Sequence, residues 1–202
     1  WNTVQFIIYN QNPSNGINSS SAVAYLFNEL GYFFRQVDHP PTLLHQLQIS
    51  CCFNGSIITK GIFFKGDFAA QLQVIESGIK KQEATTIDLE CTISDGVLEV
   101  TGNLLAWIYT MLSHREEKLV GKEFRDSHGR IPFSSSLASR QSWLNHPKIT
   151  AAIHALHEEV CKYLKSLEIP LFCKNPWPTG KSKAVVLSHD IDILDKWVLM
   201  AG

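Results

Sequence analysis

The sequence predicts a mixed α/β domain with a sheet of short strands, followed by a linker and a separate C-terminal segment. Short apolar, β-rich runs alternate with turn-rich segments through the first half of the chain. The second half carries two stretches whose apolar residues recur at helical spacing. Prolines and a glycine then interrupt residues 174–180, as is typical of a linker. We therefore expect an N-terminal domain over residues 1–172, a linker over 173–182 and a further segment from residue 183 onward.

Short strands dominate the expected elements of the first half. Residues 4–9 and 32–37 are β-rich apolar runs, and between them serine N-caps predict a helix that ends at Gly31. Further strands are expected at residues 56–58 and 61–64. A hairpin is expected from residues 85–91 and 96–100, around the turn Ser94-Asp95-Gly96. The order of these strands cannot be read from the sequence.

Two long helices are expected in the second half. The first covers residues 103–117, with Leu104, Leu105, Ile108 and Leu112 on one face. Residues 124–142 are polar and predict irregular structure. The second helix covers residues 145–167, with Asn145 as its cap and Pro147 in its first turn. Its apolar stripe consists of Ile149, Ile153, Leu156, Val160, Leu164 and Leu167.

Composition and charge exclude some classes of function. The chain has 202 residues and a formal net charge of -1, which argues against a nucleic-acid-binding surface. No apolar run is long enough to predict a membrane span, and the first residues do not resemble a signal peptide, so we expect a processed or trimmed N-terminus. The five cysteines are odd in number and form no CxxC pair. They are expected to be reduced, which favours a cytoplasmic location.

Residues with the strongest chemical signal come directly after the apolar run at 183–187, which is expected to be a strand buried on both faces. They are His189, Asp190 and Asp192. Reacting groups in α/β folds lie at the carboxyl ends of parallel strands, where one carboxylate binds a divalent metal and another takes a proton. The alternative is that Asp190 and Asp192 only cap the turn after the strand. Residue types alone leave both interpretations open.

The segment Leu187-Ser188-His189-Asp190-Ile191-Asp192 resembles the opening motif of the polysaccharide deacetylases, carbohydrate esterases with a distorted (β/α) barrel. Four upstream features recur in the same order before that barrel: Leu112-Ser113-His114-Arg115-Glu116-Glu117, Asp126-Ser127-His128-Gly129-Arg130, the Pro147 helix and Pro176-Trp177-Pro178. The resemblance covers residues 102–194.

This resemblance implies a metal-dependent hydrolysis of N- or O-acetyl groups on a carbohydrate substrate. It assigns Asp190 as the general base and Asp192 as a metal ligand, with His189 in a supporting, orienting role. The metal implied for the full-length protein is divalent, and zinc is expected. Residues 183–202 would then be the start of a barrel domain whose remainder is missing from this chain.

The chain departs from the family because it lacks the His-xxx-His motif that completes the metal site. His154 and His157 have a different spacing on the predicted helix, and surface or packing roles are the simpler interpretation for them. Catalytic zinc sites of this type use three protein ligands. We therefore expect this chain by itself to be inactive.

Other polar clusters offer weaker candidates. Asp126, His128 and Arg130 form a candidate ligand loop, for which a loop fixed by its own hydrogen bonds is the simpler alternative. Arg115, Glu116 and Glu117 predict a salt-bridged surface that packs against the next segment. The alternative function for the whole chain is a non-catalytic module that binds carbohydrate or protein. A metallophosphoesterase-like site ranks below both, because its Gly-rich partner motifs are absent.

The last apolar stretch, residues 193–200, is unusual for its position in the sequence. It is expected to bury itself in the missing barrel, and in the absence of the barrel it is expected either to be exposed or to pack on the first domain.

Overall fold

A mostly parallel β-sheet forms the base of the domain. The computed structural model describes residues 5–10, 19–37, 48–53, 61–174, 177, 180–181, 183–185 and 187. Within them the sheet has six strands in the order β2-β1-β3-β4-β6-β5, and only β5 and β6 pair antiparallel. The strands are β1 (Gln5–Asn10), β2 (Phe34–Val37), β3 (Gln48–Phe53), β4 (Gly61–Phe64), β5 (Leu89–Ser94) and β6 (Val97–Gly102).

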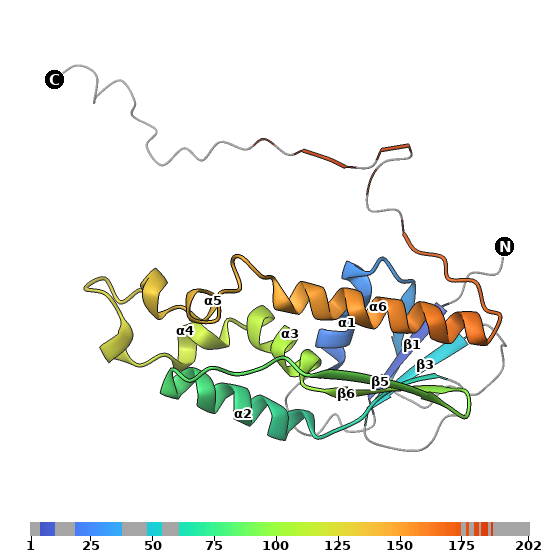
Figure 1. Cartoon of the computed structure of the whole chain (residues 1–202), viewed down its shortest axis with the longest axis horizontal. Coiled ribbons are helices and arrows are strands. Elements are labelled where there is room, and N and C mark those ends of the chain that lie inside the picture. Colours follow the sequence, from blue (N-terminus) through green and yellow to red (C-terminus); the bar gives the residue numbers. More distant parts are fainter. Residues whose placement is uncertain are drawn as a thin grey trace.

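Helices lie over the sheet and extend beyond one end of it (Figure 1). Helices α1 and α6 lie over the sheet, whereas α2, α4 and α5 gather at the far end, with α3 between the two groups. The helices are α1 (Ser19–Glu29), α2 (Phe68–Lys81), α3 (Leu104–Leu112), α4 (Arg115–Leu119), α5 (Leu137–Arg140) and α6 (Lys148–Ser166), with short 3₁₀ turns η2 (Lys122–Phe124) and η3 (Phe133–Ser135).

The main core lies between the sheet and α1, α3 and α6. Parallel pairing places Ile62 of β4 beside Leu98 of β6 and Phe64 beside Val100, so all four side chains are buried on one face. Burying each such side chain contributes about 1.5–3 kcal/mol. The Tyr163 hydroxyl of α6 accepts a hydrogen bond from the Gly61 amide at 2.7 Å and donates one to the Gly96 carbonyl at 2.8 Å. This side chain therefore joins α6 to β4 and to the hairpin turn.

A second core cluster holds the far end together. The Trp107 ring of α3 packs edge-on against Trp143, with ring centroids 5.0 Å apart. The Trp107 indole Nε1 donates to the Thr86 carbonyl at 3.0 Å, which satisfies the polar group of a fully buried side chain. Apolar residues from α2, α4–η2 and α5 complete the cluster: Leu72, Ile75, Ile79, Val120 and Leu137.

The mixed α/β class is confirmed, together with most of the expected local elements. The expected strands at residues 4–9, 32–37 and 61–64 correspond to β1, β2 and β4, and the hairpin corresponds to β5 and β6. Helix α1 ends before Gly31, which has φ 68. A Cβ at this residue would lie 2.9 Å from the Lys174 carbonyl oxygen, so glycine is required by both backbone conformation and space.

The first expected long helix is wrong in its length. It divides into α3 and α4 because His114 adopts a left-handed conformation, φ 51, which interrupts the helical hydrogen bonds. The second long helix is confirmed as α6, but its N-cap is Pro147 and not Asn145. Strand β3 and helix α2 were not expected from the sequence. Residues 124–142, which were expected to be irregular, contain the short helix α5 and the 3₁₀ turn η3. The strand expected at residues 56–58 lies outside the described residues.

The segment after α6 returns to the end of α1. Cys173 forms an antiparallel bridge with Tyr32, and the Lys174 amide donates to the Gly31 carbonyl at 2.6 Å. Further along, Val185 is 78% exposed and Leu187 is 89% exposed, and neither lies in a strand. The expected doubly buried strand at 183–187 is therefore not formed by its described residues, because such a strand needs paired neighbours on both sides.

The helices in the described ranges include none that is long and apolar enough to cross a membrane.

Candidate functional site

The predicted catalytic residues His189, Asp190 and Asp192 lie outside the described residues. Their expected proximity in space stays a prediction from the motif. The site candidates that can be built from geometry are the Asp126 loop, the histidines of α6 and a groove between helices.

The Asp126 loop is closed by hydrogen bonds within itself. Asp126 Oδ1 accepts from the backbone amides of His128 and Arg130, each at 2.9 Å. Its Oδ2 accepts from Arg130 Nε at 3.0 Å. The Arg130 amide, then the His128 amide and the Arg130 side chain, hold the pKa of Asp126 below its ordinary value. Both carboxylate oxygens therefore already have donors within the loop, as the simpler interpretation of this motif expects.

Arg125 fastens the same loop to the helix before it. Its guanidinium donates to the carbonyl of Gly129 at 2.8 Å, to that of Val120 at 3.2 Å and to that of Glu117. The planar, five-donor group suits several carbonyls at once. The sequence motif around Asp126 thus forms a rigid connection, with His128 and the Arg130 side chain exposed on it.

Residues Arg115 and Glu116 have the packing role that the sequence predicts. Arg115 Nε lies 3.2 Å from Glu76 Oε1 of α2, and its guanidinium carbon lies 5.7 Å from the centre of the Tyr109 ring. Glu116 Oε1 accepts from the Leu137 amide at the start of α5. Charged side chains of α4 therefore connect it to the helices on both sides.

The two histidines of α6, His154 and His157, lie in different environments. His157 Nδ1 lies 2.6 Å from the Tyr32 hydroxyl, and its Nε2 lies 3.6 Å from Cys161 Sγ. Burial, followed by the nearby charge of His154, lowers the pKa of His157. His154 is exposed. Among the described residues no group of three or more His, Cys, Asp or Glu side chains is arranged to hold a metal ion.

A small cavity lies where an α/β sheet often binds ligands, at the carboxyl ends of β4 and β6. It is lined by Phe64, Gly66, Gln71 and Gly102, among others. Its volume is about 20 Å³, which is room for a single water molecule. It is too small to hold a substrate.

A larger open feature among the described residues is a groove between α1 and α6, with a volume of about 480 Å³. We call it the α1/α6 groove. Its floor is Ile108 of α3, which is only 2% exposed. Its apolar lining comes from three helices and consists of Tyr25, Leu30, Met111, Leu112, Ile149 and Ile153.

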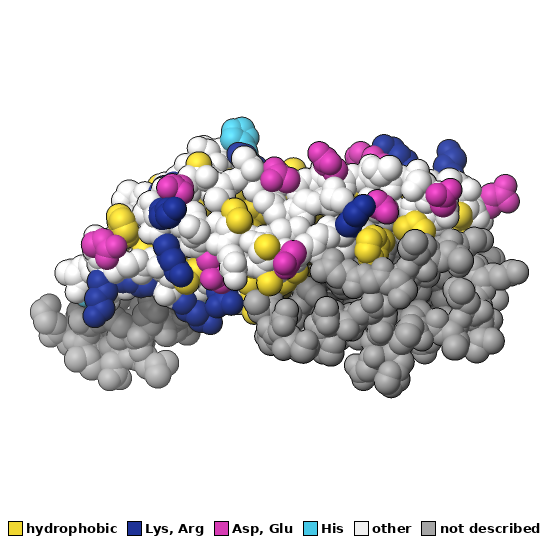
Figure 2. All heavy atoms as spheres, turned by 90° about the horizontal axis from the view of Figure 1, so that it is seen from below, with side chains coloured by type: hydrophobic (Ala, Val, Ile, Leu, Met, Phe, Trp, Pro, Cys, Tyr) yellow, Lys and Arg dark blue, Asp and Glu magenta, His cyan; other side chains and the backbone are white. Residues whose placement is uncertain are grey.

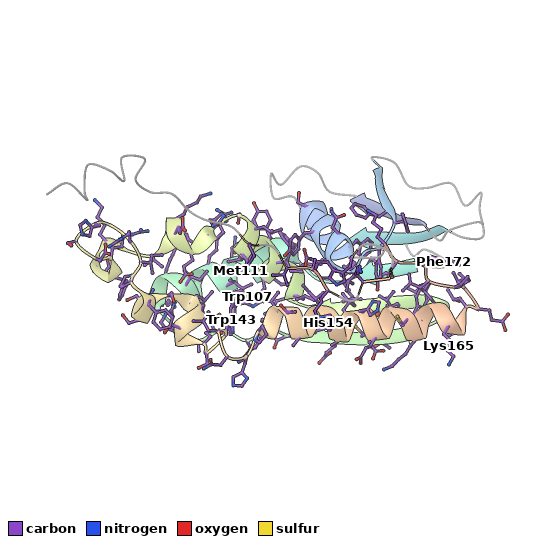
Figure 3. All side chains as sticks on the ribbon, turned by 90° about the horizontal axis from the view of Figure 1, so that it is seen from above. Trp107, Met111, Trp143, His154, Lys165 and Phe172 are labelled. Carbon is purple, nitrogen blue, oxygen red and sulfur yellow. The ribbon has the colours of Figure 1, made fainter. Side chains whose placement is uncertain are left out.

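The α1/α6 groove is bordered by side chains that reach solvent. Met111 is 44% and Leu112 is 43% exposed, although both are large and apolar. In Figure 3, Met111 of α3 and His154 of α6 are labelled, and α1 lies across from α6. On the opposite side of the molecule, seen in Figure 2, acidic and basic side chains are interspersed among small apolar areas. Sequence reasoning missed the groove, and only the continuation of apolar residues to the end of α3 hinted at it.

Comparison of the chain with family models, with curated proteins and with solved structures finds no match. The resemblance to polysaccharide deacetylases therefore stays a prediction carried by the motifs in the sequence.

Proposed function

We propose that residues 183–202 belong to the barrel of a metal-dependent polysaccharide deacetylase and that the α/β domain before them is an accessory domain. The observation that carries this proposal is the segment Leu187-Ser188-His189-Asp190-Ile191-Asp192, placed after four upstream motifs in the expected order. The substrate class is a carbohydrate that bears N- or O-acetyl groups. Asp190 is the general base, and His189 supports its orientation.

The metal site is incomplete in residues 1–202. Asp192 is the one ligand that the motif supplies, and a catalytic zinc site uses three protein ligands. The residues present do not fit a zinc ion, so the remaining ligands would have to come from sequence outside this chain. Residues 1–202 alone are accordingly expected to release no acetate.

The test is acetate release from an N-acetylated oligosaccharide by a protein extended past Gly202, with zinc supplied. Asp190→Asn and Asp192→Asn should each lower kcat at least about a hundredfold, which is the usual contribution of a positioned acid or base. Asp195→Asn is the matched control, because it changes a neighbouring carboxylate outside the motif. Activity that survives Asp190→Asn, or no acetate release by the extended protein, would contradict the proposal.

A second function is favoured by the α1/α6 groove: the accessory domain binds a protein segment. An exposed apolar groove is typical of protein interaction surfaces, whereas sugar binding needs several convergent hydrogen-bonding groups. The groove lining is mainly apolar. Chitooligosaccharide should therefore leave the NMR signal of the Met111 methyl group unchanged. A saturable shift of that signal would instead indicate sugar binding at the groove.

A further inference from the structure

The α1/α6 groove begins next to the point where the chain leaves the domain. The Tyr32 hydroxyl and His157 Nδ1, 2.6 Å apart, join the end of α1 to α6, one helical turn beyond the groove residue Ile153. At the same end, the Lys174 amide donates to the Gly31 carbonyl. Gly31 follows Leu30, which lines the groove. The chain after Lys174 therefore starts from the end of the groove.

The sequence beyond this point contains a segment with the pattern of a groove-binding helix. Ile193, Trp197 and Met200 are spaced i, i+4 and i+7, which is the spacing of anchors in an apolar groove. Leu194, Val198 and Leu199 make the segment apolar over most of the remaining helix surface as well. Eight residues in a helix span about 12 Å, less than the roughly 16 Å length of α1. The segment thus matches the groove in chemistry and in size.

The chain between the domain and the segment is long enough for the segment to contact the groove. About 20 residues separate Lys174 from Ile193, and an extended chain of that length spans up to roughly 60 Å. A tether of this kind gives a local concentration on the order of millimolar, which favours the chain's own segment over a second copy at micromolar protein.

Charge supports the same pairing. The groove border carries Glu29 on α1 and His154 on α6. The polar positions of the segment are Asp195 and Lys196. Lys196 shares a helix face with Ile193 and Met200, so its ammonium group would lie at the groove border, where Glu29 carries the opposite charge.

We propose that, in the chain of residues 1–202, residues 193–200 dock in the α1/α6 groove of the same chain and not in the barrel to which the proposed function assigns them. This proposal names the partner of the protein-binding function given above and rests on it, and it does not depend on the deacetylase chemistry. Docking would hold the His189–Asp192 motif close to the accessory domain.

The first test uses the two methionines of the chain, Met111 in the groove and Met200 in the segment. With ¹³C-methyl methionine, the full chain gives one signal from each site. Trp197→Ala should move the Met111 signal, because the aromatic ring leaves the groove. Trp177→Ala, which removes an exposed tryptophan nearer to the domain, is the matched control and should leave the Met111 signal unchanged.

The second test measures trypsin cleavage after Lys196, inside the segment. Leu112→Glu places a charge in the groove and should speed the initial cleavage at Lys196 about tenfold, since docking protects that bond. Ile93→Glu is the matched control, because Ile93 is 41% exposed, close to the 43% of Leu112, and lies on β5 away from the groove. Cleavage after Lys181 serves as the internal reference and should not change.

Two outcomes overturn the proposal. One is a Met111 signal indifferent to Trp197→Ala together with Lys196 cleavage indifferent to Leu112→Glu. The other is a Met111 signal that moves with protein concentration, which would mean that a second copy fills the groove. Trp197 is not part of the core of the α/β domain in the described residues, so the result for Trp197→Ala stands even if Leu112→Glu fails to fold. Acetate release by the extended protein is a separate measurement. A failure of the docking proposal can therefore be told apart from a failure of the deacetylase proposal.

Discussion

The Asp126 loop and the α1/α6 groove differ in how completely their groups find partners within the domain. In the loop, both oxygens of Asp126 accept hydrogen bonds from its own residues, and Arg125 donates to three carbonyls around it. In the groove, Met111 and Leu112 remain more than two-fifths exposed over a buried floor. The loop is polar and closed, whereas the groove is apolar and open.

This difference shows that the carboxylate of Asp126, which the sequence offers as a ligand group, already accepts hydrogen bonds within its own loop. Such a group bonds first to nearby backbone, and this leaves little capacity for a ligand. An apolar surface has no local partner that can satisfy it, so it requires another segment or another protein. The open feature is therefore the better candidate for binding.

The largest expected effect concerns the floor of the groove. Ile108→Ala should lower the free energy of unfolding by about 2–5 kcal/mol, because it leaves a cavity in the main core. Urea denaturation measures it. Met111→Ala on the same helix should change stability by less than about 1 kcal/mol, since Met111 is largely a surface residue. Equal losses for both variants would mean that the border of the groove is part of the core.

A smaller effect on the free energy of unfolding is expected at Arg125, which holds the Asp126 loop against α4. Arg125→Lys should cost about 1–3 kcal/mol, because an ammonium group cannot serve three carbonyls in the way a guanidinium does. The same denaturation experiment measures it. Arg130→Lys is the control, and its effect should be too small to resolve because its ion pair is exposed. If Arg125→Lys is also neutral, the loop is not held as tightly as its hydrogen bonds indicate.

Loss of the Asp126 carboxylate should act locally. Asp126→Ala removes the acceptor for two backbone amides, so hydrogen exchange at His128 and Arg130 should accelerate. Ser127→Ala, in the same loop, should leave both rates nearly unchanged. Sugar binding that disappears with Asp126→Ala while exchange stays slow would instead make this loop a ligand site.

The smallest effect is a pH dependence from His157. Its pKa in the folded protein is lowered from the ordinary 6.5, so the unfolded chain takes up a proton first as pH falls. Its stabilising contribution is present above pH 6.5 and decreases as the pH drops from there toward the folded pKa. His157→Gln should flatten the stability profile in that window, as measured by urea denaturation at a series of pH values. An unchanged slope would show that His157 is free to protonate in the folded protein.

Local signals in the sequence predicted the elements that are governed by local physics. Gly31 ends α1, and the Asp95-Gly96 turn joins β5 and β6, because both need left-handed backbone. The middle of the apolar stripe of α6 is buried as its spacing predicts, whereas Ile149 and Leu167 at its two ends are only partly buried. The Asp126 loop also follows the simpler of its two interpretations.

Features that depend on contacts between distant segments could not be predicted in this way. Strand β3 has polar residues at Gln48 and Ser50 and few branched ones, so its place inside the sheet comes from its neighbours. The break between α3 and α4 occurs at His114, and no glycine or proline next to it indicates a helix end in the sequence. The α1/α6 groove exists only because three helices leave space between them. For α2 a signal was present and overlooked, in the Asp67 cap and the spacing of Leu72, Ile75 and Ile79.

The two hydrogen bonds of the Tyr163 hydroxyl constrain the order in which the parts of the domain can fold. Its partners, Gly61 and Gly96, are made long before α6 during synthesis. Until α6 leaves the ribosome, β4 and the hairpin turn lack the side chain that joins them, and the apolar face of the sheet is covered only by α1 and α3. The domain should therefore fold late and in one cooperative step, as non-local contacts of this length require. Fragments that stop before α6 are then expected to aggregate, and shortened versions of this protein should retain residues through Lys174.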